Sequence, residues 1–554
     1  MRFVQRQAVR FAAACLGGFL GCLARGDDVP FGSLLWLQGI DGNPPLPGFQ
    51  VDGTLRLEAI DEPTDIALNL SAGRLTNSLT GVIDVRAGPG GARYITGPVL
   101  NLGEMDINAI NLSWYGNGQC ENHGTIKITG TVGFGFYGGS TVLDLEAGTI
   151  IKGDSRTGYV WVQNGQFVFN GGSVDFPVYV ALASARLGDG ATNPITLNFV
   201  GPGCTCDGAL TANRTLHLMA DGRFAPLTLA LAHAPRLDGA MQIDTQPSGS
   251  PIALTLAPGG LLISPQGSLT TGAGGLGVAV TGNLTNSGTI RQAGPLQLSG
   301  SAPVVNTGTW TIASGAPLAV STPLIQTAGA FILAGGQVTA HSGITLSGGV
   351  FSGDGILFAS LSNSIAVTLT RNRPLTVSGD WAQAATASLE IRVADADPSS
   401  EAAALQVNGQ LSLDGPLRVT TNGPITWTPG QSVSLASVTN LSMLTGWFSD
   451  VQLPVLPAGM HWTMPASTNL FRFVTTTNEP ALELLGQGGI TNRYSLAVFG
   501  PLGTDLVVEQ STDLHAWQPV TNEARFEGLA RFSLPPATEP QLWYRARFTL
   551  AVEN

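Results

Sequence analysis

Charged side chains are scarce in this sequence: Asp, Glu, Lys and Arg make up 12% of its 554 residues, about half of the usual share. Only two of the 26 basic residues are lysines, Lys127 and Lys152, and the formal net charge is −12. This balance argues against nucleic-acid binding, which needs a basic footprint. Aromatic residues are also few, at 7%, but the hydrophobic share of 43% is ordinary and is enough for a large core.

Long apolar runs and helical periodicity are missing as well. After residue 26 no apolar run reaches the roughly 18 residues that indicate a membrane-spanning helix, so we expect a soluble mature chain. No stretch keeps a helical apolar period long enough for a good helix. Glycine, by contrast, is abundant: 72 residues, close to twice the usual share, without the every-third spacing of collagen.

The first 26 residues have the layout of a secretory signal. Three arginines precede an apolar run over residues 11–23, and small residues follow it. A membrane anchor is the alternative, but the run is shorter than the ~20 residues that a spanning helix needs. A lipid anchor at Cys22, which follows Gly21, is a second alternative. The sequence therefore predicts a signal peptide over 1–26 and a secreted or cell-surface protein.

A repeated tag runs through the region that follows the signal. The tag is Asn-x-Gly-Thr with an apolar residue after it, and looser copies continue the series; the copies lie at 122–126, 286–290, 306–310, 326–330 and 347–351. A second series of Gly-Thr-Ile or Gly-Ser-Val triplets recurs every 24 residues, at 124–126, 148–150 and 172–174. Between the tags, apolar and polar residues alternate in short bursts, which is typical of half-buried strands.

This pattern predicts an all-β fold, a right-handed parallel β-helix over residues 27–374. Each turn of about 20–24 residues holds two or three short strands, and successive turns stack about 4.8 Å apart around an apolar interior. Asparagine or threonine recurring once per turn can stack as a ladder of side-chain hydrogen bonds. A set of antiparallel sandwiches is the alternative, but sandwiches do not impose a fixed register of this length.

Residues 375–464 carry a series of strand and turn motifs. The series opens with LTVSGDWAQ at 375–383, continues with LSLDGPLRV at 411–419 and closes with GWFSDV at 446–451. This layout resembles the end of passenger domains in autotransporter-type bacterial surface proteins. The resemblance implies a segment that finishes and caps the β-helix, which we place at 375–485.

The chain that follows this segment is short. Too few residues come after position 464 for the membrane-inserted transporter domain of such proteins, so the resemblance is to the passenger alone. After a glycine-rich linker at 486–489, residues 490–554 are similar to a small β-sandwich module found on exported bacterial proteins. The strings STDLHAW at 511–517 and WYRA at 543–546 carry that likeness.

The aromatic residues of this module allow two interpretations. Trp517, Tyr544 and Phe548 are expected to form its core, because large aromatic residues mostly serve cores. A glycan-binding role for the same side chains is the alternative.

Three cysteines remain after the signal: Cys120, Cys204 and Cys206. In an oxidising compartment a disulfide among them is expected, with plain thiols or a metal site as alternatives. No paired spacing typical of a zinc site is present, so we predict no metal. The string GAGGLG at 272–277 matches a dinucleotide-binding fingerprint by letter. A strand rather than a helix is predicted after it, so we predict no cofactor.

The candidate catalytic residues are few. Asp84, Asp106, Lys127 and Lys152 recur at steps of 22, 21 and 25 residues, a spacing that would stack them on one outer face. Asp144 and Glu146 lie two apart, on the same side of a strand. A solvated face that keeps the protein soluble explains these residues without any catalysis.

Three functions are compatible with the sequence. The first is an exported non-catalytic protein, adhesin-like or structural, whose partner is a cell-envelope component, a polysaccharide, or a host or neighbouring surface. The second is a polysaccharide lyase or glycoside hydrolase that works with Asp106, Asp144, Glu146 and Lys127; it requires these side chains to converge. The third is glycan binding by the C-terminal module.

Overall fold

The computed structural model describes most of the chain between residues 28 and 550. The described residues are 28–37, 45–59, 65–89, 91–154, 158–220, 223–233, 236–244, 251–273, 275–393, 402–439, 443–464, 470–477, 482–485, 495–499, 504–512, 515–523, 529–533 and 543–550. The predicted signal peptide (1–26) and the predicted linker (486–489) lie outside them.

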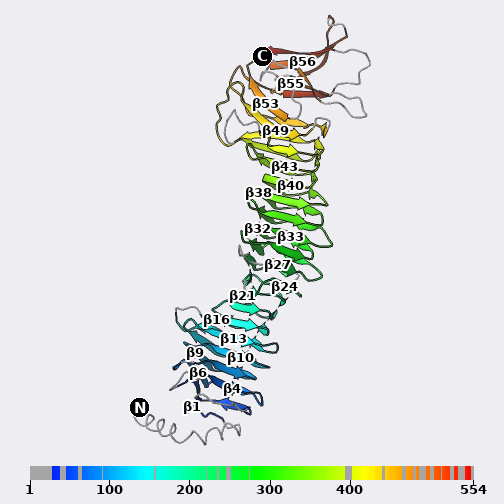
Figure 1. The fold of residues 1–554 in the computed structure, drawn as a ribbon. Coiled ribbons are helices and arrows are strands. Elements are labelled where there is room, and N and C mark those ends of the chain that lie inside the picture. The colour runs from blue at the N-terminus through cyan, green and yellow to red at the C-terminus, as the bar shows by residue number, and fades with distance from the viewer. Residues whose placement is uncertain are drawn as a thin grey trace. The chain divides into compact units, whose positions relative to one another are not determined.

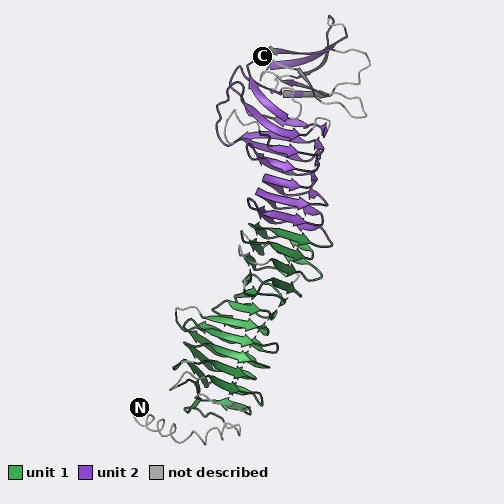
Figure 2. Cartoon of the chain, viewed as in Figure 1, with its two compact units in different colours: residues 1–301 green, residues 302–554 purple. Residues whose placement is uncertain are grey.

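The predicted all-β parallel β-helix is confirmed. The described residues form β-strands and contain no α-helix. Stacked parallel strands build a β-solenoid of about 15 turns. The chain divides into two compact units, residues 1–301 and 302–554 (Figure 2).

Most turns in the first unit contain three short strands joined by glycine-rich corners. In Figure 1 the strands of successive turns lie above one another, and each pairs in parallel with its counterpart in the next turn. One such turn is followed directly by the next: β9 (Glu104–Asn108), β10 (Leu112–Tyr115) and β11 (Gln119–Asn122), then β12 (Thr125–Thr129), β13 (Gly133–Tyr137) and β14 (Val142–Leu145).

The repeat in the sequence sets the register of these turns. Thr125 in β12 lies opposite Thr149 in β15 (Thr149–Lys152), and Thr149 lies opposite Ser173 in β18 (Ser173–Val174). These are the residues that recur every 24 positions in the sequence. The register is firmly specified because a slip of one residue would turn every apolar side chain toward water.

The interior of the first unit is filled by side chains at alternate strand positions. In β10 and β13 the buried residues are Leu112, Trp114, Phe134 and Phe136, each with no exposed surface. The Trp114 ring stacks on Phe136 with ring centres 5.3 Å apart and meets the edge of Phe134 at 5.8 Å. A single turn has no neighbour against which to bury its apolar side chains, so this packing depends on the stacking of turns.

A ladder of buried asparagines runs along one inner corner of the first unit. Asn77, Asn101 and Asn122 end β5 (Leu75–Asn77), β8 (Val99–Asn101) and β11, and all three are fully buried. Asn77 Nδ2 donates to Asn101 Oδ1 at 2.7 Å, and Asn101 Nδ2 donates to Asn122 Oδ1 at 2.6 Å. The asparagine ladder expected from the repeated tag is therefore present.

The second unit continues the same construction and then changes its pairing within the predicted cap (375–485). β46 (Leu405–Val407) and β49 (Ser432–Val438) still pair in parallel. β49 then pairs antiparallel with β53 (Leu470–Thr476), which also pairs antiparallel with β52 (His461–Thr463). An antiparallel partner occupies backbone groups that another strand or molecule would otherwise pair with.

The last part of the chain forms two three-stranded antiparallel sheets. One contains β54 (Leu482–Leu485), β55 (Ser495–Phe499) and β58 (Leu529–Ser533); the other contains β57 (Gln518–Glu523), β56 (Thr504–Ser511) and β59 (Trp543–Leu550). Tyr544 and Phe548 pack against their common apolar cluster. Trp517 lies under the guanidinium of Arg545, 4.3 Å from its ring centre, so a cation already covers the ring that was a candidate for sugar binding.

Candidate functional site

The four acid and base candidates lie in two groups on different sheets. Asp106 in β9 and Lys127 in β12 belong to a seven-stranded parallel sheet, where they are direct neighbours. Asp144 belongs to β14 of another sheet, and Glu146 follows that strand. The chain therefore brings together Asp106 with Lys127, and Asp144 with Glu146.

Asp106 and Lys127 belong to a column of outward side chains whose ion pairs centre on Asp84. Asp84 lies opposite Arg56 on one side and opposite Asp106 on the other. Its carboxylate is nearly buried and accepts from Arg56 Nη2 at 2.8 Å and from Arg86 Nε at 2.8 Å. A carboxylate held by two guanidinium groups helps to fix the register of neighbouring turns.

Lys152 does not belong to this column. The residue opposite Lys127 is Ile151, and Lys152 lies opposite Ile128 instead. The turns repeat every 24 residues here, whereas Lys127 and Lys152 are 25 apart, and one residue reverses the face of a strand. The predicted stack therefore holds for Asp84, Asp106 and Lys127 only.

The Asp144 and Glu146 carboxyls share one donor. Asn170 Nδ2 donates to Glu146 Oε1 at 2.8 Å and to Asp144 Oδ1 at 3.2 Å. Burial raises the pKa of Asp144 to about 6, and the neighbouring charges of Glu146 and Glu121, together with a hydrogen bond to Glu146, add to the effect. Glu121 lies directly opposite Asp144 on β11.

Glu121 has the opposite electrostatic environment. A hydrogen bond with His123, 2.9 Å away, lowers the pKa of Glu121, and the guanidinium of Arg74, 2.7 Å from the other oxygen, contributes in the same direction. Two carboxyls with pKa values moved apart can act as a proton donor and an acceptor. Sequence reasoning missed Arg74 and Asn170, because they lie 47 and 24 positions from Glu121 and Glu146 and no motif pairs them. It also missed His123, which is two residues from Glu121 but belongs to no paired-histidine motif.

The closeness of Asp144 and Glu146 limits what this pair can do. Both carboxyls accept from Asn170 Nδ2, at 3.2 and 2.8 Å, so these two oxygens lie no more than about 6 Å apart, closer than the carboxyls of an inverting glycosidase usually stand. Asp144 is better described as a weak acid whose pKa is raised to about 6, mainly by burial.

We expect Asp144→Asn to stabilise the protein near neutral pH and to change little under acidic conditions. The pKa of Asp144 is raised from an ordinary 3.8 to about 6 in the folded protein. The folding stability that its protonated form contributes is therefore fully present below about pH 4 and is lost as pH rises through about 6. The difference in melting temperature between variant and wild type should therefore grow by a few degrees from about pH 4 to pH 8. Exposed Asp189→Asn is the control, and a difference that stays constant with pH would contradict the assignment.

The expected disulfide is not formed. Cys120, Cys204 and Cys206 are free and buried. Cys120 and Cys206 lie in one inward column but four pairings apart, about 19 Å, far beyond the reach of a disulfide; the residues between them are Leu143, Phe167 and Ala185. Burial raises the pKa of both thiols to about 12, which makes them unreactive.

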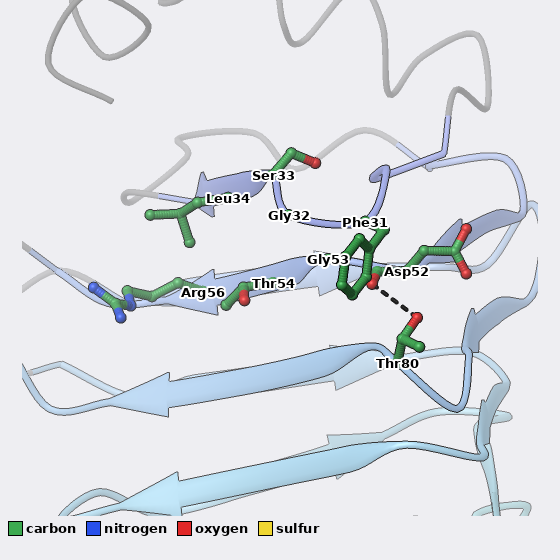
Figure 3. Close-up of a pocket in the computed structure, with 9 residues that line it drawn as sticks. All are labelled: Phe31, Gly32, Ser33, Leu34, Asp52, Gly53, Thr54, Arg56 and Thr80. Atoms are coloured by element: carbon green, nitrogen blue, oxygen red, sulfur yellow. Dashed lines mark hydrogen bonds between the residues drawn. The ribbon is translucent and has the colours of Figure 1, made fainter. Parts of the chain in front are cut away.

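None of the four candidate residues lines either of two surface hollows found among the described residues. The first, of about 340 Å³, lies beside β1 (Leu34–Leu37) and is lined by Phe31, Asp52, Arg56 and their neighbours. Figure 3 shows Thr80 at its edge, where its Oγ1 donates to the carbonyl oxygen of Asp52 at 3.1 Å. The second, of about 440 Å³, lies around His341 and Phe358.

Neither a metal centre among the described residues nor a known relative indicates a further site. The described residues contain no group of three or more His, Cys, Asp or Glu side chains arranged to hold a metal ion, and no helix long and apolar enough to cross a membrane. No protein-family model matches the sequence, and no curated protein or solved structure matches it either.

Proposed function

We propose that this protein is an exported, non-catalytic surface or extracellular protein, adhesin-like or structural, that presents the outer faces of its β-solenoid to a partner. The observation that carries the proposal is the division of the four acid and base candidates between two sheets, on a solenoid whose stacked turns are otherwise regular. A repeated outer face offers the same contact many times, which favours extended partners.

Two sequence features support the proposed location. The signal-like segment at 1–26 and the resemblance of 375–464 to autotransporter passengers support export to the cell surface or beyond. The partner we propose is a polysaccharide, a cell-envelope component, or a neighbouring or host surface. The net charge of −12 supports repulsion from nucleic acids and from other acidic polymers.

A polysaccharide-cleaving enzyme is the second candidate. The raised pKa of Asp144 beside the lowered pKa of Glu121 favours it, because a proton donor and an acceptor stand on adjacent strands. The shared donor Asn170, which holds the Asp144 and Glu146 oxygens no more than about 6 Å apart, weighs against the wide carboxyl separation of inverting glycosidases.

One incubation separates the two functions. The mature protein is mixed with a panel of neutral and acidic polysaccharides, and both depletion of protein from solution and release of new chain ends are measured. Binding without cleavage is the expected result. Release of chain ends that stops in Asp144→Asn, and continues in Asp189→Asn, would replace the proposed function with the enzymatic one.

A further inference from the structure

One outer face of the first unit collects most of the tyrosines of the chain. Five of the seven tyrosines point outward from strands of five consecutive turns; they are Tyr94, Tyr115, Tyr137, Tyr159 and Tyr179. The strands are β7 (Arg93–Thr96), β10, β13, β16 (Tyr159–Gln163) and β19 (Val178–Ala181), which pair successively in parallel. Figure 1 shows β10, β13 and β16 one above another. We call this surface the aromatic face.

The rings of the aromatic face contact one another across turns in two runs. Tyr94 and Tyr115 meet edge to face with ring centres 5.4 Å apart, and Tyr115 stacks on Tyr137 at the same separation. In the next two turns Trp161 stacks on Tyr179, again at 5.4 Å. The five turns together extend about 19 Å along the solenoid.

Two glycines of β13 leave room for tyrosine rings on the aromatic face. Gly135 lies opposite Trp161, and a Cβ built there would be 2.5 Å from Cε2 of the Tyr137 ring. Gly133 lies opposite Tyr159, and its Cβ would be 2.3 Å from Cε2 of that ring. The rings therefore cover the backbone of β13 where side chains would otherwise stand.

The aromatic face is not needed to complete the core. Its inward neighbours Phe134, Phe136, Val160 and Val162 have no exposed surface and already fill the interior. The outward rings are partly exposed, and Tyr115 has 41% of its surface open to water. A contiguous patch of this kind on a soluble protein indicates an interaction surface.

The chemistry of the aromatic face is neutral. No outward position of these five strands carries a charged side chain, although the chain as a whole has a net charge of −12. The other outward residues are small or polar and include Ser113, Thr96 and Gln163, whose Oε1 accepts from Trp161 Nε1 at 3.2 Å. Without a cation, the face offers nothing to hold a phosphate or a carboxylate.

We propose that the aromatic face is the binding platform for a neutral polysaccharide chain. The apolar C–H faces of sugar rings stack on flat aromatic rings, and sugar hydroxyls pair with tyrosine hydroxyls and with Gln163. A polymer suits this surface because rings recur once per turn and each contact adds to the last. The inference rests on the proposed adhesive function and names its partner.

Affinity electrophoresis in gels that contain one soluble polysaccharide tests the proposal. The probes are hydroxyethyl cellulose, a mixed-linkage β-glucan, dextran and galactomannan as neutral polymers, and polygalacturonate as an acidic one. At least one neutral polymer should retard the wild-type protein, and polygalacturonate should not. Retardation by none of the neutral polymers would overturn the inference and would favour a protein partner.

Three variants locate the binding surface. Tyr115→Ala combined with Trp161→Ala should weaken binding about tenfold or more, because buried aromatic contacts dominate such interfaces. Tyr115→Phe should retain binding, since the ring remains. Gly135→Ala keeps every ring but displaces Tyr137, so it should also weaken binding. Phe358→Ala is the matched control, since Phe358 is 45% exposed in the second unit.

The outcomes separate this inference from the proposed function. If the wild type binds a neutral polysaccharide and the double variant binds it equally well, the aromatic face is not the binding surface, but the adhesive function is still supported. If the wild type cleaves the polymer and the double variant loses binding, the aromatic face is supported while the non-catalytic function fails. Circular dichroism of each variant confirms that a loss of binding is not a loss of folding.

Discussion

Replacing Trp114 with alanine is expected to destabilise its part of the solenoid by about 3–5 kcal/mol. The side chain has no exposed surface, stacks on Phe136 and meets the edge of Phe134. Its Nε1 also donates to the carbonyl oxygen of Gly97 at 3.0 Å. The substitution therefore leaves a large cavity and an unpaired carbonyl inside the stack.

Native-state hydrogen exchange is the measurement that fits a solenoid. Because each turn contacts only its neighbours, long stacks do not always unfold as one unit, and local opening energies are better defined than a single global value. Amides of β10 and β13 should lose protection by the amount above. Tyr115→Ala, one residue further along the same strand but outward, is the control and should change protection by less than about 1 kcal/mol. Equal losses in both variants would contradict the inward stacking of Trp114.

Replacing Asn101 with leucine is expected to cost about 2–4 kcal/mol, although the two side chains have similar size. The leucine cannot accept from Asn77 Nδ2 or donate to Asn122 Oδ1, which are now joined to Asn101 at 2.7 and 2.6 Å. Both partners stay buried, so each loses a hydrogen bond that water cannot replace. Urea denaturation followed by hydrogen exchange in β5, β8 and β11 measures the loss.

Asn117→Leu provides the control for the asparagine ladder. Asn117 is exposed at the corner after β10, and its Oδ1 accepts from the exposed Ser140 Oγ, where water can replace the bond. The same chemical change should therefore stay within about 1 kcal/mol. A small effect of Asn101→Leu, similar to that of Asn117→Leu, would mean that the ladder follows from the stacking of turns and does not stabilise it.

The repeat made the fold and much of the register predictable. Residues 24 apart in the sequence, such as Thr125 and Thr149, lie directly opposite each other. The tag asparagine Asn122 ends its strand at an inner corner, as a ladder requires. Cys120 and Cys204 are 84 residues apart, about four turns by the same period, and both thiols are free.

The aromatic face left a signal in the sequence that was not used. Its five tyrosines are separated by 21, 22, 22 and 20 residues, which is the period of the turns. The predicted site residues, Asp106, Asp144, Glu146 and Lys127, were chosen for their charge instead. In a parallel solenoid, any residue type that recurs with the period of the turns forms a surface, whether or not it can transfer protons.

The sequence by itself determined the all-β class, the parallel stacking and which residues share a column, because strand alternation and turn length are local properties of the chain. Only the tertiary structure decided the exact length of each turn, which removed Lys152 from its column by one residue. It alone joined Arg74 to Glu121 across 47 positions and laid Tyr137 over Gly135. Such contacts depend on corner geometry and side-chain direction, which a repeat does not encode.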